Sequence, residues 1–233
     1  MVSQADESPI MPIKHGDTLV EGQEVHFGLS ALGLCLGFAN TLEDRLTGHP
    51  HETLNSYGDL LAWGSRQGIL MGREAERLAR QASRRPARAA STLERAVALR
   101  EAIYRIFSAV AGGHSAPPAD LAILNAVLAA ALASLRIVTM GDGFAWVWPR
   151  GEEMLDRVVW PVALSAADLL TSSERRAVRE CAAANCGWLF LDTTRNRSRR
   201  WCDMKVCGNR AKARRHYERK RASATPADRA NRR

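Results

Sequence analysis

Two cysteine pairs of identical spacing lie close together near the C-terminus, and they constrain the fold of that region more than any other feature. Four residues separate Cys181 from Cys186, four separate Cys202 from Cys207, and fifteen lie between the pairs. Four thiolates can surround one tetrahedral zinc ion when each pair sits in a tight turn. A glycine follows the second cysteine of each pair, and glycine tolerates the positive φ that such a turn requires. The spacing therefore predicts one zinc ion held by all four cysteines.

A zinc ion in this setting is structural, because four thiolates complete its coordination shell and leave no position for water or substrate. Four unrelated buried cysteines and an iron–sulfur cluster are the alternatives, and no nearby residue suggests redox chemistry. His216 is a spare ligand that we set aside, since it lies nine residues after Cys207. A module of roughly 40 residues buries too little surface to fold alone, and a structural zinc contributes roughly 10–16 kcal/mol of apparent binding free energy.

The net charge of the chain is concentrated in the same region. Residues 181–233 carry 15 basic and 4 acidic side chains, a net charge of +11. The whole chain has 33 Lys and Arg against 25 Asp and Glu, so residues 1–180 carry 18 basic and 21 acidic side chains, a net charge of −3. A block of like charge is usually an interaction surface or a solvated arm. We interpret this block as a nucleic-acid-binding surface, with a solvated basic helix or an acidic protein partner as the alternatives.

The pattern around the cysteines predicts how this surface is built. Residues 188–192 alternate like a strand, residues 193–201 form a polar turn, and residues 209–221 have the composition of a basic helix. A zinc-stapled hairpin that leads into a helix is a treble-clef-like or ribbon-like arrangement. One guanidinium group can donate two hydrogen bonds to the oxygens of one phosphate, and side-chain amides fix the position of the protein along the nucleic acid. The residues predicted to contact DNA are Arg195, Arg197, Arg199, Arg200, Lys205, Asn209, Arg210, Lys212, Arg214 and Arg215.

The rest of the chain predicts a mainly α fold with one small β-hairpin, an α+β arrangement. The apolar run at 33–40 is compatible with a strand or a helix, and helical structure is expected again from 173 up to 181. Segments 91–94 and 165–168 have the spacing of capping boxes, which predicts that helices begin there. The glycines at 141 and 143 lie between two β-prone runs, which predicts a hairpin with its aromatic residues on one packed face.

Four segments follow from these patterns. They are an N-terminal arm at 1–26, a mostly helical domain at 27–180, the zinc module at 181–221 and a disordered basic tail at 222–233. The N-terminal arm has no signal-peptide core, and no stretch approaches the roughly 20 apolar residues of a membrane span, so we expect a cytoplasmic protein without a membrane partner. Cysteine usage agrees, since four of the five cysteines belong to the zinc motif. The fifth, Cys35, lies on the apolar run and is expected in the core.

A dense polar cluster follows the apolar run and offers the second candidate site. Asn40, Thr41 and Arg45 could line a pocket for a small polar or anionic effector, or they could form a helix end with local capping and an ion pair. The sequence shows no paired carboxylates, no Ser/His/Asp set and no phosphate loop, so we expect no enzyme.

The cysteine motif resembles a known family. Cys-x4-Cys-Gly-Trp-Leu-Phe-Leu-Asp, followed by Arg-Arg-Trp-Cys-Asp-Met-Lys-Val-Cys-Gly-Asn-Arg, is similar to the CGNR zinc finger, whose name matches residues 207–210. The front of the chain, with Leu-Gly-Phe-Ala-Asn-Thr at 36–41, resembles its companion, the ABATE domain, a family regarded as stress-induced transcription regulators. The resemblance covers about residues 27–221.

What the resemblance implies is a bacterial transcription regulator. The front domain would sense a ligand or form a homodimer, and the finger would bind DNA. An adaptor whose finger binds a protein of the transcription machinery is the alternative, and a small-molecule-binding enzyme domain is the less favoured one.

Overall fold

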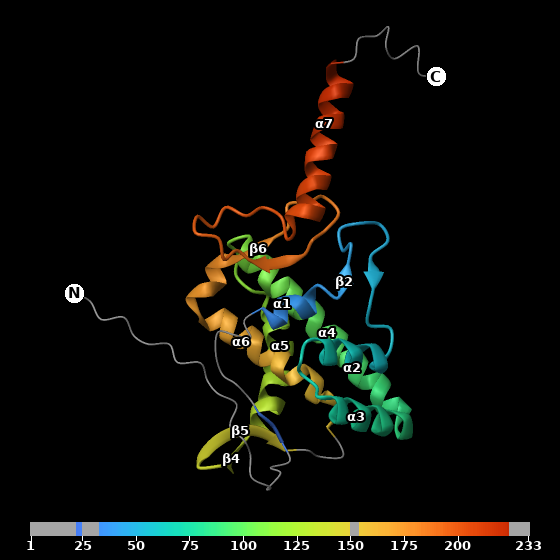
Figure 1. Cartoon of the computed structure of the whole chain (residues 1–233), viewed down its shortest axis with the longest axis vertical. Coiled ribbons are helices and arrows are strands. Elements are labelled where there is room, and N and C mark those ends of the chain that lie inside the picture. The colour runs from blue at the N-terminus through green and yellow to red at the C-terminus, as the bar shows by residue number, and fades with distance from the viewer. Residues whose placement is uncertain (1–21, 25–32, 150–153, 224–233) are drawn as a thin grey trace, which may run out of the picture. The chain divides into compact units, whose positions relative to one another are not determined.

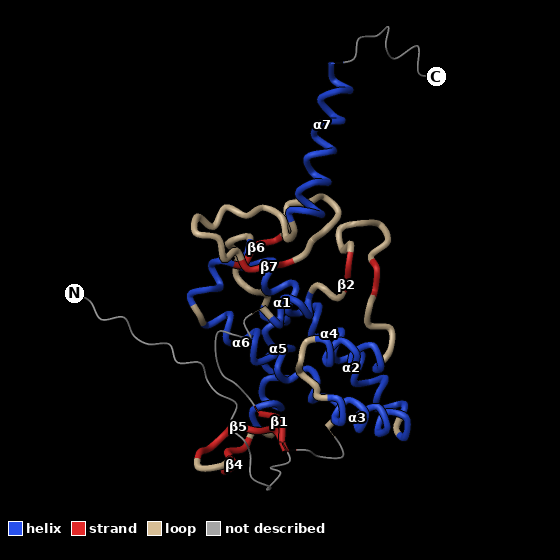
Figure 2. The backbone as a smooth tube through the Cα atoms, in the orientation of Figure 1, coloured by secondary structure: helices blue, strands red, loops and turns tan. Residues whose placement is uncertain are grey.

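The computed structural model describes residues 22–24, 33–149 and 154–223. These residues are mainly helical, with short antiparallel strand pairs, and the fold class predicted from the sequence is confirmed (Figures 1 and 2). They form two compact units, which we describe separately. One unit contains strand β1 and residues 134–149, and the other contains the remaining described residues. None of the helices in the described ranges combines the length and hydrophobicity that crossing a bilayer requires.

The first unit is a three-stranded antiparallel sheet. Its strands are β1 (Gly22–Glu24), β4 (Arg136–Met140) and β5 (Gly143–Pro149), in the order β1-β5-β4. The predicted hairpin is therefore present, and Gly141 supplies the positive φ of 60° at its turn. Strand β1 lies inside the predicted N-terminal arm, whose other residues fall outside the described ranges.

The aromatic residues of β5 do not form the single packed face that their alternation predicts. Trp148 is buried, but Phe144 is 79% exposed and Trp146 is 42% exposed. Alternation places side chains on one face of a strand, but what covers that face depends on residues elsewhere in the chain.

The second unit is built around one long helix, α4. Its helices are α1 (Leu34–Ala39), α2 (Tyr57–Arg66), α3 (Gly72–Arg84), α4 (Pro86–Ala111), α5 (Pro118–Ala133), α6 (Trp160–Thr171) and α7 (Asn209–Ser223). Single helical turns occur at η2 (Leu155–Val159), η3 (Ser173–Ala177) and η4 (Met204–Gly208). The strand pairs are β2 (Leu42–Glu43) with β3 (His51–Glu52) and β6 (Val178–Glu180) with β7 (Leu189–Leu191). Helix α4 contacts α1, α2, α3, α5 and β6, so its apolar stripe forms the centre of the core.

The stripe on α4 is the one that the sequence predicts, but the helix begins earlier than predicted. Leu99, Ile103, Ile106 and Phe107 are completely buried, as their helical spacing requires. The capping box predicted at 91–94 is wrong, because the helix already starts at Pro86 and runs through that segment. Proline at the first helical turn has its φ preset for a helix and loses no hydrogen bond there, so Pro86 sets the start.

The same error recurs in α6, where Ser165 lies in the middle of the helix and is buried. Its hydroxyl accepts a hydrogen bond from the backbone N–H of Cys35 instead of capping. A capping box is present at α2, where Ser56 accepts from the N–H of Asp59 and Asp59 accepts from the N–H of Ser56. Local spacing thus marks a cap only where the preceding residues are not themselves helical.

The apolar run that was open to either interpretation is the helix α1, and Cys35 is completely buried within it as predicted. Burial raises the pKa of the Cys35 thiol to about 12, so this cysteine behaves as an inert core residue. The expected helix from 173 to 181 is shorter than predicted, because Val178–Glu180 form strand β6 and pair with β7. Of the predicted tail at 222–233, the first two residues end helix α7, and 224–233 lie outside the described residues.

Candidate metal centre and nucleic-acid interface

The four cysteines of the two pairs converge on one point. The Sγ atoms of Cys181, Cys186, Cys202 and Cys207 all lie within 4.8 Å of one another. The Sγ of Cys202 is 3.6 Å from that of Cys186 and 3.7 Å from that of Cys207. Four sulfurs at about 2.3 Å from a tetrahedral zinc ion are about 3.8 Å apart, so the observed cluster fits zinc closely. None of the four forms a disulfide.

Electrostatics at the cluster also favour a cation. Cys181, Cys186 and Cys207 are buried, and burial raises the pKa of Cys186 to about 12. Several thiolates packed this closely repel one another, so they ionise together only around a positive charge. Phe190 is part of the same buried cluster, and the partly buried Trp188 and Trp201 pack against it. The four thiolates fill the coordination shell, so the ion has no open position for chemistry and is structural.

The two turns around the metal site use their glycines differently. Gly187 has a φ of +71°, as the sequence predicts for a chain that folds back around a metal. Gly208 has no positive φ, and it lies in the π-helical turn η4. A Cβ at Gly208 would overlap the thioether of Met204, which is the flexible and half-exposed end of that side chain. Asp203 caps this turn by accepting from the N–H groups of Lys205 and Val206.

The loop between the two turns is held by a buried carboxylate. Asp192, at the end of β7, accepts hydrogen bonds from the hydroxyl and N–H of Thr194 and from the N–H of Arg199. The hydrogen bond from the Thr194 hydroxyl is the main cause that lowers the pKa of Asp192. Arg199 donates in turn to the carbonyls of Trp201 and Cys202, and its guanidinium lies over the Phe190 ring. Arg199 is thus occupied in bracing the loop.

The other predicted DNA contacts are exposed side chains on this loop, on η4 and on α7. Arg197 lies 3.8 Å from Glu174, and Arg214 pairs with Glu218 one turn along α7. The Asn209 amide donates to the carbonyl of Lys205. Of these other predicted contacts, six basic side chains have no carboxylate at ion-pair distance within the described ranges: Arg195, Arg200, Lys205, Arg210, Lys212 and Arg215.

Comparison with protein families agrees with this geometry. A family model described as "Putative stress-induced transcription regulator", ABATE, matches residues 32–173. The chain belongs to the ABATE family. The CGNR zinc finger model matches residues 177–220, which include all four cysteines, so the cluster is a CGNR zinc finger that binds one structural zinc ion. No curated protein matches the chain. Both families are the ones that the sequence motifs predict.

The polar cluster of the ABATE domain lies against the zinc finger. Asn40, at the C-terminal end of α1, donates to the carbonyl of Leu189 and accepts from its N–H, both at 2.9 Å. Leu189 is in β7, and its N–H and C=O point away from β6, so the Asn40 amide pairs with the free edge of the strand. On β6, Glu180 accepts from the hydroxyls of Ser108 and Tyr104 of α4. The finger is therefore docked on α1 through the backbone of β7 and on α4 through the Glu180 side chain of β6.

The two other residues of that cluster are also engaged within the chain. Thr41 is buried and donates to the carbonyl of Phe38, one turn back. Arg45 donates to both oxygens of Glu101 and to the carbonyl of Ala39, and it stacks over the Tyr104 ring at 3.9 Å. This arrangement is that of the alternative interpretation, a helix end with local capping and an ion pair.

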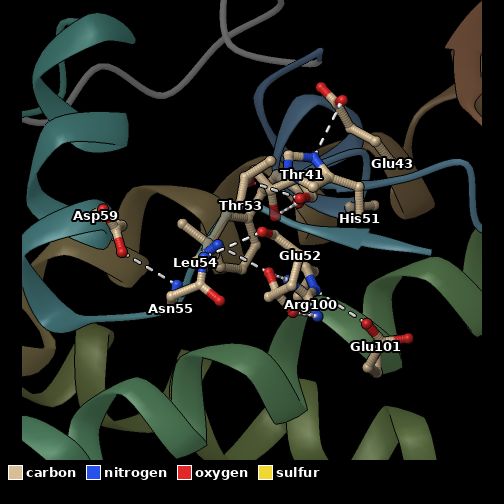
Figure 3. A network of polar contacts seen from close by, with 12 residues as sticks. Thr41, Glu43, His51, Glu52, Thr53, Leu54, Asn55, Asp59, Arg100 and Glu101 are labelled. Carbon is tan, nitrogen blue, oxygen red and sulfur yellow. Dashed lines mark hydrogen bonds and ion pairs between the residues drawn. The ribbon is translucent and has the colours of Figure 1, made fainter. Parts of the chain in front are cut away.

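Sequence reasoning missed the ion-pair network behind this cluster (Figure 3). Arg100 of α4 is 2% exposed and donates to both oxygens of Glu52 at 2.6 and 2.7 Å, and to Glu101 at 2.9 Å. Glu101 also binds Arg45, so α4, β3 and the junction with the zinc finger share one network. The sequence does contain one indication of this network. Arg100 lies four residues after Ala96 and three before Ile103, so it is an arginine on the otherwise apolar stripe of α4.

Replacing Asn40 with alanine is expected to loosen the docking of the zinc finger. Both backbone groups of Leu189 would lose their partner in a half-buried site, which destabilises by about 1–3 kcal/mol. Denaturant unfolding of the zinc-loaded chain measures this. Asn125→Ala, on the exposed side of α5, is the matched control and should change stability by less than about 0.5 kcal/mol. Equal stability of the two variants would contradict the docking role of Asn40.

Acid is expected to destabilise the ABATE domain through the Arg100 network. Burial opposes ionisation of Glu52 and Glu101, but hydrogen bonds and charge from Arg100 and Arg45 outweigh it and lower the pKa of both carboxyls below 4.5. Because the folded pKa is the lower one, the stabilisation is present above pH 4.5 and is lost as the pH falls below it.

The same network gives a mutational test at neutral pH. Arg100→Met leaves the partly buried Glu52 without its bidentate partner and leaves Glu101 with Arg45 alone, so it should cost about 3 kcal/mol. Arg95 forms an exposed pair with Asp156, so Arg95→Met should cost less than about 1 kcal/mol. Chemical unfolding at pH 7 and at lower pH checks both points, and a flat acid profile for the wild-type chain would argue against the network as the cause.

Proposed function

We propose that this protein is a DNA-binding transcription regulator of the cytoplasm and has no catalytic activity. In this proposal residues 181–221 contact DNA and residues 27–180 form the regulatory domain. The ABATE family description supports a regulator. The observation that carries DNA binding is the set of six exposed basic side chains, without carboxylate partners in the described structure, around one zinc-stabilised fold.

The chemistry of these side chains suits the phosphate backbone. Arginine forks bind phosphate oxygens bidentately, and such contacts position a protein on DNA without reading its sequence. Asn209 and Arg210, at the start of α7, are the residues we propose to reach base edges. A single small module gives modest sequence discrimination, so a homodimer or a contribution from the front domain completes the specificity.

Regulation requires that the front domain influence the finger. The contacts of Asn40 with Leu189 and of Glu180 with α4 supply a direct connection between them. An effector bound at Asn40, Thr41 and Arg45 would have to displace the contacts that these side chains already make. We therefore assign Asn40 to docking, and Thr41 and Arg45 to contacts within the front domain, in preference to ligand binding.

An adaptor that binds a protein is the second candidate, and a specific feature favours it. Met204 and Val206 of the turn η4 are 47% and 53% exposed, and a protein partner that covered them would bury their apolar surface, which favours binding. Both flank Lys205, so one turn presents features that suit either partner.

Binding to a labelled DNA duplex separates the two candidates. The zinc-loaded chain is expected to bind with a dissociation constant of about 1–100 μM at physiological salt, and tighter at lower salt. Met204→Ser with Val206→Ser should leave this affinity within about twofold, because the phosphate contacts remain. A large loss of DNA affinity in that variant, or no binding by the wild-type chain, would favour the adaptor.

A further inference from the structure

A basic cavity lies where helix α3 meets helix α4, built entirely from residues outside the zinc finger. Its volume is about 160 Å³, and it is lined by Arg77, Arg80, Gln81, Arg84 and Arg85. Four of these five side chains are arginines, although residues 1–180 carry a net charge of −3. The cavity is therefore a concentration of positive charge that the overall composition of the front domain does not predict.

The helical repeat explains how the sequence builds this cavity. Arg77, Arg80, Gln81 and Arg84 follow the i, i+3, i+4, i+7 pattern, which places them on one face of α3. Arg85 is the single residue between α3 and α4. From residue 77 to residue 88 the chain contains five arginines and no acidic residue. On most helices the residues at this spacing are apolar and face the core, whereas here they are three arginines and a glutamine, whose side chains donate hydrogen bonds.

The start of α4 adds to the positive potential. Helix α4 has 26 residues, no side-chain cap at its N-terminus and no acidic residue in its first turn. The first N–H groups of a helix carry partial positive charge, so arginines beside them are repelled while an anion is attracted. The positive charge of Arg84 stabilises the C-terminal end of α3, but it does not stabilise the first turn of α4.

Two further properties of the cavity limit which ligands it can hold. Gln81 lines the cavity, and its Oε1 atom is buried without a hydrogen-bond partner in the described structure, so this side chain has an unused acceptor for a hydroxyl. Drug-sized ligands occupy pockets of about 300–1,000 Å³, so a cavity of about 160 Å³ suits a much smaller molecule. It is still far larger than the roughly 10–15 Å³ that one water needs.

We propose that this cavity is a binding site for a small oxyanion, inorganic phosphate or a phosphate monoester. The guanidinium groups would bind the phosphoryl oxygens, and Gln81 would accept from the protonated oxygen or from a hydroxyl of the ester. Each guanidinium has five N–H donors, so arginines that already contact other parts of the chain keep donors for the ligand. The site goes beyond the proposed DNA binding and does not depend on it.

Calorimetric titration of the zinc-loaded chain with inorganic phosphate, at constant ionic strength, tests this site. Saturable binding is expected, and Arg80→Gln with Arg84→Gln should weaken it about 100-fold, since each charge-assisted contact is worth about tenfold. Arg66→Gln with Arg73→Gln removes the same charge from exposed positions outside the cavity and should change little. Replacing Arg80 and Arg84 with lysine keeps the positive charge but removes the bidentate contacts. An affinity between those of the wild-type chain and the glutamine variant would show that the lysine variant is folded and lacks only those contacts.

Two further ligands and one further variant separate the sources of phosphate. Glycerol 3-phosphate, a small phosphate monoester, identifies a monoester as the ligand if it binds through the same arginines more tightly than phosphate, and the reverse order identifies free phosphate. Arg210→Gln with Arg215→Gln in the zinc finger should leave phosphate affinity unchanged. Equal phosphate affinity in the wild-type chain and in the Arg80 and Arg84 variant would overturn the proposal. The proposal would also be overturned if the Arg80 and Arg84 variant lost as much affinity for a DNA duplex as for phosphate, because these arginines would then bind the DNA backbone.

Discussion

Removing zinc is expected to unfold the zinc finger while the ABATE helices stay folded. The finger has a small core that consists of Cys181, Cys186 and Cys207 with Ala183 and Phe190, so most of it is made of zinc ligands and little holds it together without the ion. Structural zinc in comparable sites supplies roughly 10–16 kcal/mol of apparent binding free energy, more than a module of this size gains by burial. The helical domain keeps its own core around α4, so its far-ultraviolet circular dichroism should largely persist.

Substituting single cysteines gives the sharper form of this experiment. Cys202→Ser should lower the zinc content from one ion per chain to well below one, and hydrogen exchange should become fast across residues 178–221. Cys35→Ala is the matched control, because Cys35 is buried in α1 and should leave the zinc content unchanged. Freshly purified, reduced wild-type protein without metal would refute the zinc centre.

Removing three positive charges from helix α7 is expected to abolish most DNA binding while the finger stays folded. Arg210, Lys212 and Arg215 are exposed and have no carboxylate partner in the described residues, so replacing all three with glutamine removes charge without breaking a structural contact. A charge-assisted hydrogen bond contributes about 1.5–3 kcal/mol, so three lost contacts should lower affinity by about 1,000-fold or more.

Two controls make that result interpretable. Zinc content and the melting temperature of the triple variant should match those of the wild-type chain, because all three side chains are exposed. Arg199→Gln should behave differently, since Arg199 braces the loop through the carbonyls of Trp201 and Cys202 and its loss should lower stability. If the triple variant bound DNA as tightly as the wild-type chain, α7 would not be the contact surface.

The zinc finger could be predicted from sequence because its determinants are local. Two pairs of identical spacing specify both the ligands and the turns that present them, and the basic run after the last cysteine has the composition of a helix. Charge is also additive along the chain, so its concentration after residue 180 was visible without a structure.

The junction could not be predicted, because its contacts join distant parts of the chain. Asn40 pairs with the backbone of Leu189, 149 residues away, and no local pattern marks either residue as the partner of the other. Capping signals failed for a related reason. Ser165 satisfies the local rule for a helix start, yet tertiary packing uses it inside α6 as an acceptor for the backbone of Cys35.

The salt dependence of binding is the sharpest test of whether the zinc finger contacts DNA phosphates. Each phosphate contact releases counterions and contributes about −0.9 to the slope of log K against log salt, so four to six contacts predict a slope of about −4 to −5 for the zinc-loaded chain. Removing one contact, as in Arg215→Ala, should flatten the slope by about one unit and weaken all sequences alike. A slope near zero, or no measurable binding at a salt concentration of about 50 mM with zinc verified in place, would contradict the account and point to a protein partner.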